Sequence, residues 1–309
     1  MRFTREVEGI DALATDVNLS KLCTVINIDM AKKKYQKRNS TARQVRTAVI
    51  VVAVIVAVWW FIGHAKDLGF KRVESGAPSS NVDVEALMEV NAPEGLRQQI
   101  VAYEGYTASF NADLRIPNYV VYELTRFETQ GAEPRHNKFM CDTDVEGCPT
   151  TDDYKGSDYD RGHMAPAADM KWSKKAMQES FFLTNICPQN HSLNSGGWKR
   201  LEEKVRLWAD RDSAVIVVSG PIVQGHINRL ESGVAVPTGF FKVLLAPFAT
   251  PKRAIAFIYK NEGGQKVIER QAVSVDEVEA LTGFDFFSSL PYDEENEIEK
   301  TCDYYEWNN

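Results

Sequence analysis

The sequence predicts an α+β fold with a mixed or antiparallel sheet at its core. Four runs rich in β-branched, aliphatic and aromatic residues are typical of strands. They span residues 118–127, 213–220, 239–246 and 253–260. Helical patterns lie among these runs without the regular strand–helix alternation of a parallel sheet. The chain has 309 residues, 44% of them hydrophobic, which suffices for a sizeable core in one or two domains.

Three segments have the composition of helices. They span residues 171–180, 196–212 and 274–283. In the last of them Ser274 stands three residues before Glu277, the pattern of a capping box. Gly283 closes the same segment and suits a helix C-terminus. We therefore expect this helix to begin and end close to these residues.

An uncharged apolar run, residues 47–63, is at the short limit for spanning a bilayer. Residues 31–46 before it hold seven Lys or Arg and no acid. The positive-inside rule places a basic N-terminal segment, residues 1–46, in the cytoplasm. Everything after the run is expected to be extracytoplasmic: periplasmic, cell-surface or secreted. A buried strand or helix is the alternative interpretation of the run.

The fate of this run is open between a transmembrane signal-anchor and the core of a cleaved signal peptide. Small residues around Ala65 suit a cleavage site. Translation from Met30 would place a short basic leader directly before the run, and residues 1–29 would then be absent from the protein. The membrane is thus a predicted partner if residues 47–63 are retained.

Composition divides the remainder of the chain into three parts. Residues 64–95 are expected to form a polar linker, residues 96–290 a folded domain, and residues 291–309 an acidic tail. Residues 276–309 contain eleven Asp or Glu and one Lys, so the rest of the chain carries +3 against a total of −7. The overall negative charge therefore argues only weakly against a polyanionic ligand.

Four cysteines follow the apolar run: Cys141, Cys148, Cys187 and Cys302. An even number in an oxidising compartment predicts disulfides. Cys141 with Cys148 is the local choice and leaves Cys187 with Cys302, but all three pairings stay open. A zinc site is the alternative, although six residues between Cys141 and Cys148 do not give the close spacing of zinc knuckles.

One histidine follows an acid–Arg–Gly turn in the segment SDYDRGHMAPAADM, residues 157–170. A neutral imidazole can accept a proton or bind a metal. A lone histidine is more often structural than catalytic. His163, however, comes two residues after Arg161, a side chain suited to bidentate contact with phosphate. This context indicates general-base chemistry on a phosphate ester.

Amides crowd the segment NICPQNHSLNSGGW, residues 185–198. Asn194 precedes a predicted helix in which Glu202 and Arg206 share one face. Hydrolysis of a phosphodiester needs an activated water and positive charge near the phosphate. Mg²⁺ takes oxygen ligands, so an amide and a nearby carboxylate suit it. The alternative is that amides cap the helix and satisfy turn backbone, which applies chiefly to Asn185, Gln189 and Asn190.

Three segments together resemble the DNA/RNA non-specific endonuclease family, endonuclease G-like ββα-metal nucleases with a DRGH motif. They are DRGHMAPAADM, FFLTNICPQ and LNSGGWKRLEEKVR, and they match in order and spacing. The combination of DRGH with a downstream N-x3-W-x2-LE is highly specific. The likeness covers about residues 95–290, so it implies a ββα-metal active site and an endonuclease domain at residues 96–290.

The resemblance also implies roles for individual residues. His163 would be the general base that activates water, and Asn194 the one direct protein ligand of Mg²⁺. Glu202 would hold the ion through water, and Arg161 would contact phosphate. The further catalytic candidates are Arg135 and Arg206, and the supporting candidates are Asp160 and Asn185.

The function that this implies is an exported, sugar-non-specific endonuclease. It would hydrolyse DNA and RNA to 5′-phosphate products with Mg²⁺, for which Mn²⁺ could substitute. Contacts to phosphates rather than base edges would explain a lack of sequence preference. Two alternatives are a metal-dependent phosphodiesterase with a non-nucleic-acid substrate and a catalytically silent nucleic-acid-binding relative.

Overall fold

The computed structural model describes residues 82–308. The apolar run 47–63 and the basic segment before it lie outside the described residues, so the membrane anchor stays a prediction. Between residues 82 and 308, no helix is both long enough and apolar enough to cross a membrane. Residues 82–308 lie in one compact unit.

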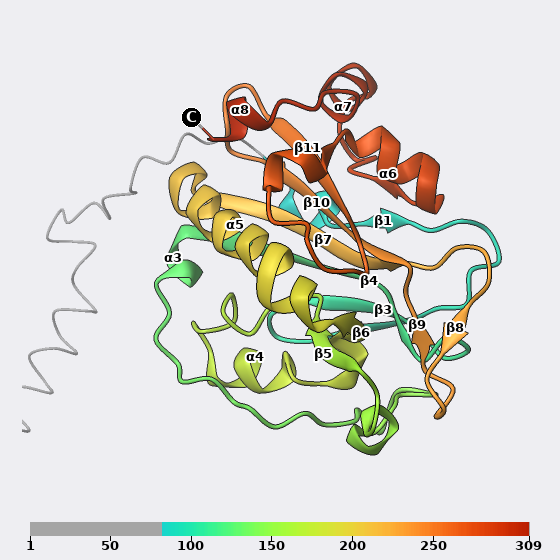
Figure 1. The fold of residues 1–309 in the computed structure, drawn as a ribbon. Coiled ribbons are helices and arrows are strands. Elements are labelled where there is room, and N and C mark those ends of the chain that lie inside the picture. Colours follow the sequence, from blue (N-terminus) through green and yellow to red (C-terminus); the bar gives the residue numbers. More distant parts are fainter. Residues whose placement is uncertain (1–81, 309) are drawn as a thin grey trace, which may run out of the picture. The chain divides into compact units, whose positions relative to one another are not determined.

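A seven-stranded antiparallel sheet forms the centre of this unit (Figure 1). Its strands run in the order β12-β11-β10-β7-β4-β3-β2. Their bounds are β2 Gln99–Ala102, β3 Thr107–Asn111, β4 Ile116–Thr125, β7 Ala214–Ile222, β10 Gly239–Ala246, β11 Arg253–Lys260 and β12 Ala272–Val273. The predicted sheet and all four predicted strands are therefore confirmed.

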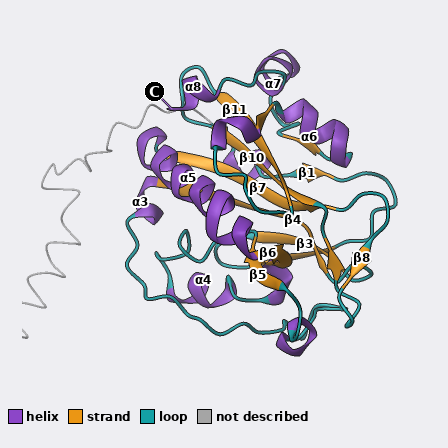
Figure 2. Ribbon diagram, in the orientation of Figure 1, coloured by secondary structure: helices purple, strands orange, loops and turns teal. Residues whose placement is uncertain are grey.

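Helices cover both faces of the sheet (Figure 2). They are α2 Val84–Leu87, α3 Arg126–Thr129, α4 Lys174–Glu179, α5 Lys199–Asp212, α6 Val275–Thr282, α7 Tyr292–Glu299 and α8 Tyr304–Asn308. Short strands complete the unit: β1 Val90–Asn91, β5 Tyr159–His163, β6 Ile186–Asn190, β8 Asn228–Arg229, β9 Ala235–Val236 and β13 Asp285–Phe286. The three predicted helices correspond to α4, α5 and α6.

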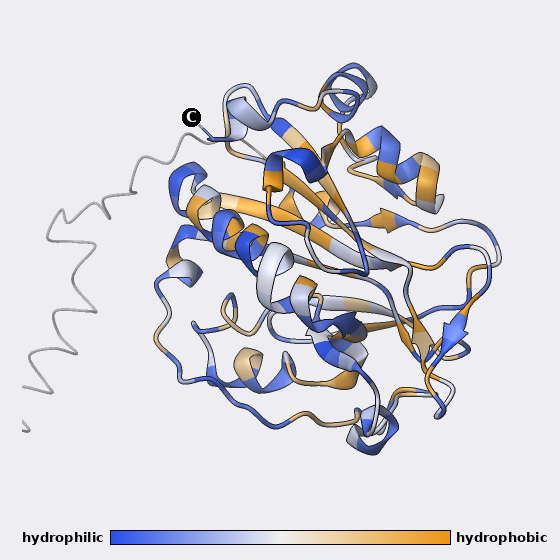
Figure 3. Ribbon diagram, in the orientation of Figure 1, coloured by the Kyte–Doolittle hydropathy of each residue, from blue (hydrophilic) through white to orange (hydrophobic). Residues whose placement is uncertain are grey.

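Two hydrophobic cores lie on opposite faces of the sheet, because alternate side chains of a strand point to opposite sides. In β7, Val215 and Val217 belong to the core beneath α5, whereas Ile216 and Val218 belong to the core beneath α6. A strand buried on both faces lacks polar alternation, which explains its continuous apolar sequence (Figure 3). The strand β10 is also buried along its whole length, and its sequence is apolar except for one lysine.

The ends of α6 are those that its sequence predicts. Ser274 Oγ accepts a hydrogen bond from the Glu277 backbone, and the Glu277 side chain accepts one from the Ser274 backbone. Gly283 follows the helix with a φ of 75°, a conformation that favours glycine. The helix α5 begins later than predicted because residues Leu193–Trp198 form a π-helical turn.

Structure extends into the expected linker and into the expected tail. Within residues 64–95, α2 forms and β1 pairs with β13. Within residues 291–309, α7 and α8 form, and the buried Trp307 ring packs 5.2 Å from the Trp208 ring on α5. The division into domains stays a prediction, but these contacts join residues 82–95 and 291–308 to the compact unit.

The predicted disulfides are wrong, since all four cysteines between residues 82 and 308 are thiols. Cys187 lies on β6 inside the core, whereas Cys302 is exposed after α7, and the two sulfurs are not bonded. Cys141 and Cys148 are neighbours, but each forms hydrogen bonds as a thiol. The Cys141 thiol donates to the Cys148 carbonyl at 3.4 Å, and the Cys148 sulfur accepts from the Asp142 backbone at 3.3 Å.

Candidate active site

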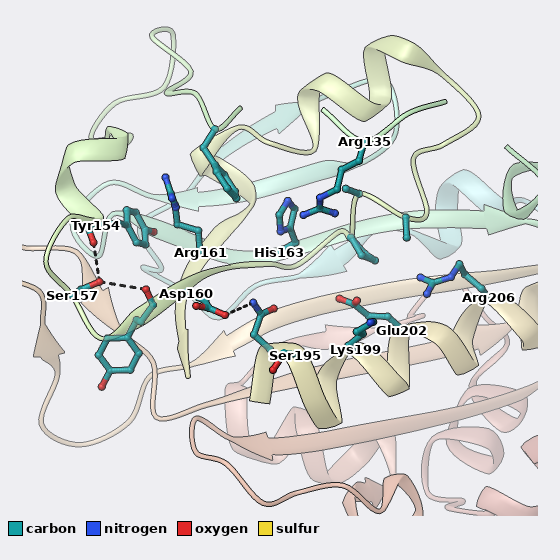
Figure 4. Close-up of a pocket in the computed structure, with 16 residues that line it drawn as sticks. Arg135, Tyr154, Ser157, Asp160, Arg161, His163, Ser195, Lys199, Glu202 and Arg206 are labelled. Carbon is teal, nitrogen blue, oxygen red and sulfur yellow. Dashed lines mark hydrogen bonds between the residues drawn. The ribbon is translucent and has the colours of Figure 1, made fainter. Parts of the chain in front are cut away.

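A pocket of about 640 Å³ lies where β5, the π-helical turn and α5 meet (Figure 4). It contains seven of the eight residues that the sequence predicted for the site: Arg135, Asp160, Arg161, His163, Asn194, Glu202 and Arg206. The predicted residue that lies outside it is Asn185. Segments up to seventy residues apart in the sequence thus contribute to one cavity.

The strand pair β5–β6 places the DRGH motif on the pocket wall. The strands pair antiparallel, with Gly162 opposite Cys187 and His163 opposite Ile186. At Gly162 a side chain has no room, because a Cβ would lie 2.2 Å from Oε1 of the buried Gln189. The expectation that Gln189 satisfies turn backbone is wrong, since both of its side-chain polar atoms lack a partner. Glycine is therefore required for this close strand packing.

The π-helical turn between β6 and α5 carries Asn194. Asn190 Oδ1 accepts hydrogen bonds from the backbones of Ser192 and Leu193, at 2.9 and 3.3 Å, and so begins this turn. This confirms the capping role expected of Asn190. A π-turn inserts an extra residue into a helix and is common at functional sites. Here it turns Asn194 toward the pocket at the start of α5.

His163 is a buried histidine with a neutral ring. It is 9% exposed, and its Nε2 has no hydrogen-bond partner. The rings of Phe181 and Phe139 lie 5.0 and 5.4 Å from it. Burial, and then the nearby charge of Arg135, lowers the pKa of His163 to about 3. At neutral pH the imidazole is therefore unprotonated and has a free lone pair.

Asp160 sets the orientation of the Asn194 amide. Asn194 Nδ2 donates to Asp160 Oδ2 at 2.8 Å, which turns Oδ1, the atom predicted to bind the metal, away from this contact. His191 Nδ1 lies 2.9 Å from the same carboxylate oxygen, and the His191 ring is largely exposed. Asp160 thus orients the Asn194 amide as well as the turn. His191 contacts Asp160 from the exposed side.

A buried charge network lies beneath Glu202. Asp169 accepts hydrogen bonds from Arg206 at 2.7 Å and from the Tyr122 hydroxyl at 2.8 Å. The buried Lys242 Nζ donates to Ser219 and lies 4.6 Å from the centre of the Trp198 ring. Burial raises the pKa of Glu202, and the positive charge of Lys242 opposes this rise. Burial also lowers the pKa of Lys242.

No sequence pattern had indicated a role for Lys242 or Asp169. The signal for Lys242 was a single lysine within GFFKVLLA, an otherwise apolar strand, where a buried charge requires a partner. Asp169 is the second-to-last residue of the quoted motif DRGHMAPAADM, and nothing in its spacing indicated that it pairs with Arg206. Both residues act through Glu202 and Arg206 and have no place in the pocket lining.

Two arginines near His163 are available for an anion. The Arg161 guanidinium lies 4.5 Å from the centre of the Phe139 ring, and that of Arg135 lies 5.0 Å from the Phe181 ring. Neither forms an ion pair with any residue from 82 to 308. Stacking on aromatic rings positions a guanidinium without neutralising it. The pocket therefore has positive charge beside His163 that no described residue pairs with.

Asn185 supports the chain beyond His163 from inside the core. Its Oδ1 accepts from the Ala165 backbone, and its Nδ2 donates to the carbonyls of Ala165 and Ser180, each at 2.8 Å. Three of the four hydrogen bonds that this buried amide can make go to the backbone nearby. Its amide is therefore not free to bind a ligand.

Comparison with known proteins gives consistent matches. A family model for DNA/RNA non-specific endonucleases matches residues 83–293. Human mitochondrial nuclease EXOG is 35% identical over 222 residues, which cover 65% of this chain and 59% of that protein. Nuclease C1 of Cunninghamella echinulata var. echinulata is 33% identical and is covered over 89% of its length, against 67% of this chain.

A solved structure, a crystal structure of an EndoG/EndoGI complex, has a TM-score of 0.60 and 27% identity. The match covers 64% of this chain and 89% of that one. It confirms the predicted ββα-metal fold, in which β5, β6 and α5 surround the pocket. The chain spans 59% of the length of the mouse and human EXOG proteins.

The names of the relatives contradict the predicted extracytoplasmic location. Those from Mus musculus, Homo sapiens, Schizosaccharomyces pombe and Saccharomyces cerevisiae are named as mitochondrial nucleases. The prediction of export rested on an apolar run after a basic segment, a pattern that does not by itself distinguish between destinations. The family model, in contrast, spans more than half of the chain and includes the whole pocket, so the chain belongs to the DNA/RNA non-specific endonuclease family.

Proposed function

We propose that this protein is a metal-dependent, sugar-non-specific endonuclease that hydrolyses DNA and RNA to 5′-phosphate products. One observation carries the proposal. A histidine that burial keeps neutral and an asparagine whose amide is oriented by Asp160 line the same pocket, beside two unpaired arginines. Family membership gives the substrate class, and the names of the relatives agree with it.

The oxygen donors of the pocket fit a hard divalent cation. Asn194 Oδ1 and the Glu202 carboxylate would hold Mg²⁺, Asn194 directly and Glu202 through water, with Mn²⁺ as a substitute. The Glu202 carboxylate forms no ion pair with any residue that the structure describes. When bound, the ion supplies positive charge to the phosphate and to the leaving oxygen.

The side chains would divide the remaining work. His163 would take a proton from the attacking water, through Nδ1 because Nε2 is enclosed by protein. Arg161 and Arg135 would hold the phosphate oxygens. Arg206, paired with Asp169, would position Glu202 one helical turn away on α5.

The proposal is tested with supercoiled plasmid and with single-stranded RNA, each in Mg²⁺ and in EDTA. Wild type should cleave both polymers only with the metal, and His163→Ala should lower kcat by about 10²-fold or more. His226→Ala, an exposed histidine on a loop, is the matched control and should keep full activity. End-labelling of the products should show 5′-phosphates.

Other outcomes would reject the proposal. Binding of either polymer without cleavage would indicate a silent relative. Absence of both binding and cleavage would favour a phosphodiesterase with a different substrate. Asn194→Ala should also lose activity that excess Mg²⁺ restores only in part, and full activity at ordinary Mg²⁺ would make the metal assignment wrong.

A further inference from the structure

A cluster of carboxylates lies between α6 and α7, on the opposite face of the sheet from the pocket (Figure 1). Asp276 and Glu279 are one turn apart on α6, and Glu299 is the last residue of α7. One carboxylate oxygen from each of the three lies within 4.8 Å of the others. Three acids in such proximity repel one another unless a cation or protons neutralise them.

Nearby basic side chains do not neutralise the cluster. Asp285 and Glu295 add further negative charge around it. Between residues 82 and 308, no Lys, Arg or His forms an ion pair with Asp276, Glu279 or Glu299. The adjacent ion pair of Lys252 uses Glu294 instead.

Glu299 gives an independent reason to expect a ligand. The residue is only 5% exposed, and its Oε1 has no hydrogen-bond partner. A buried carboxylate oxygen without a partner is costly. The position of Glu299 at the end of α7 raises this free-energy cost, because the C-terminus of a helix carries partial negative charge. Such a terminus favours a cation. The oxygen without a partner thus belongs to Glu299, whose carboxylate lies beside those of Asp276 and Glu279.

We propose that Asp276, Glu279 and Glu299 bind a Ca²⁺ ion. All three donors are hard oxygens, and no cysteine or histidine belongs to the cluster. Ca²⁺ accepts six to eight oxygens in flexible geometry, whereas Mg²⁺ is usually held by one or two carboxylates. Asp276 is exposed, so water has access to complete the coordination. Phe286 already donates a backbone hydrogen bond to Glu279 Oε1 at 2.8 Å, which positions that carboxylate.

The ion would join α6 to α7 and have a structural role. Val275 and Val278 of α6 and Ile298 of α7 lie in the same core, so ordering these helices stabilises that face of the sheet. Protons are the competing solution. Burial and the neighbouring acids raise the pKa of Glu299 to about 9 and that of Glu279 to about 7. The test must therefore separate binding of Ca²⁺ from simple protonation.

Thermal unfolding and calorimetric titration of the full chain at pH 8, in EGTA or in Ca²⁺, make this distinction. Ca²⁺ at about one hundred times its Kd should raise the Tm of wild type by about 5 °C or more. Glu299→Gln keeps the shape of the side chain and should lose this shift and one bound Ca²⁺. Glu297→Gln removes the same charge from an exposed position of α7 and should keep both.

Two further variants keep the proposal open to rejection. Asp276→Asn changes an exposed ligand and should weaken Ca²⁺ binding at least about tenfold even if Glu299→Gln folds poorly. Asn194→Ala should keep the Ca²⁺ shift, because its amide lies in the active-site pocket. Equal Ca²⁺ shifts in wild type and Glu299→Gln would mean that protons alone neutralise the cluster. Loss of the shift in Asn194→Ala would assign the ion to the other site. Either result overturns the inference without bearing on nuclease activity.

Discussion

Asp160 is the residue on which the orientation of the candidate metal ligand depends. It accepts the Asn194 Nδ2 hydrogen bond at 2.8 Å, so the amide oxygen points elsewhere. Without this contact the amide can rotate and offer its nitrogen, which is no metal ligand. We expect Asp160→Ala to weaken the apparent Mg²⁺ affinity of cleavage by about 10- to 100-fold, the usual effect of losing a group that orients a ligand. Plasmid cleavage across a Mg²⁺ titration measures this.

Asp158→Ala is the control for that variant. Asp158 is exposed two residues earlier and does not line the pocket, so its loss changes the charge but not the amide. Cleavage by Asp158→Ala should depend on Mg²⁺ as in wild type. If both variants shift the Mg²⁺ dependence equally, the effect is one of general charge and Asp160 has no orienting role.

Burial of His163 predicts how stability depends on pH. The pKa falls from an ordinary 6.5 to about 3 in the folded protein, so between these values the unfolded chain binds more protons. The stability associated with the neutral ring is therefore complete above pH 6.5 and is lost as the pH falls. Relative to His163→Gln, wild type should lose about 2 kcal/mol of unfolding free energy between pH 6.5 and 5.

Urea unfolding of both proteins at several pH values measures the difference. His226→Gln removes an exposed histidine. This variant shows how much the pH dependence of the unfolding free energy changes when a histidine that is not buried is lost. A difference between wild type and His163→Gln that does not vary with pH would mean that the folded protein does not hold the ring neutral.

At the scale of elements, the strand pair β5–β6 determines where the chemistry lies. In Gly162→Ala the new Cβ would meet the Gln189 side chain at 2.2 Å for Oε1 and 2.6 Å for Cβ. Rotation of Gln189 cannot relieve the second contact, so the strands must separate. We expect the variant to lose about 1–3 kcal/mol of stability, as overpacking does, and most of its nuclease activity. Thermal unfolding and plasmid cleavage measure the two effects.

Gly196→Ala provides the comparison. Gly196 lies in the π-helical turn, and a Cβ there would meet no atom within 4 Å. This variant should keep its stability within about 0.5 kcal/mol of wild type. If Gly162→Ala loses no more stability than Gly196→Ala, the strand packing tolerates a side chain. The presence of glycine in the motif would then need another explanation.

The elements differ in how far the sequence predicted them. Strands β7, β10 and β11 and helix α6 were predictable, because burial on both faces and capping leave local signals. Strands β5 and β6 were not, because YDRGH is short and polar and pairs with a segment more than twenty residues away. The π-turn was equally hidden, since its extra residue is decided by packing and not by composition.

The candidate site was predictable only where it matched a motif. Six residues of the quoted motifs lie together in the pocket with Arg135, but Lys242 comes from a strand whose sequence indicated only burial. Its role depends on how α5 crosses the sheet, which no local pattern specifies. The disulfide prediction failed for a related reason, since it used an inferred compartment in place of the distance between Cys187 and Cys302.

Across the whole molecule, charge separates into two regions. The acidic segment 276–309 supplies a net −10, and its carboxylate cluster lies across the sheet from the pocket. The pocket itself is lined by Arg135, Arg161 and Lys199, with Arg206 paired to Asp169. An acidic protein can therefore still attract a polyanion, because the four basic side chains of the pocket outnumber its two carboxylates, Asp160 and Glu202, and the carboxylate cluster lies across the sheet.

This separation predicts a salt dependence that DNA and RNA share. If about three basic side chains contact phosphates, the logarithm of kcat/KM should fall with the logarithm of salt concentration with a slope of about −2.7 on duplex DNA, or about 40-fold between 50 and 200 mM. The slope on single-stranded RNA should be somewhat shallower. Lys199→Gln should reduce the DNA slope by about 1, whereas Lys204→Gln, on α5 outside the pocket lining, should leave it unchanged. Steady-state rates at several salt concentrations decide this. A steep slope on one polymer and none on the other would mean that recognition uses the sugar or the bases, and the non-specific mode of binding would be wrong.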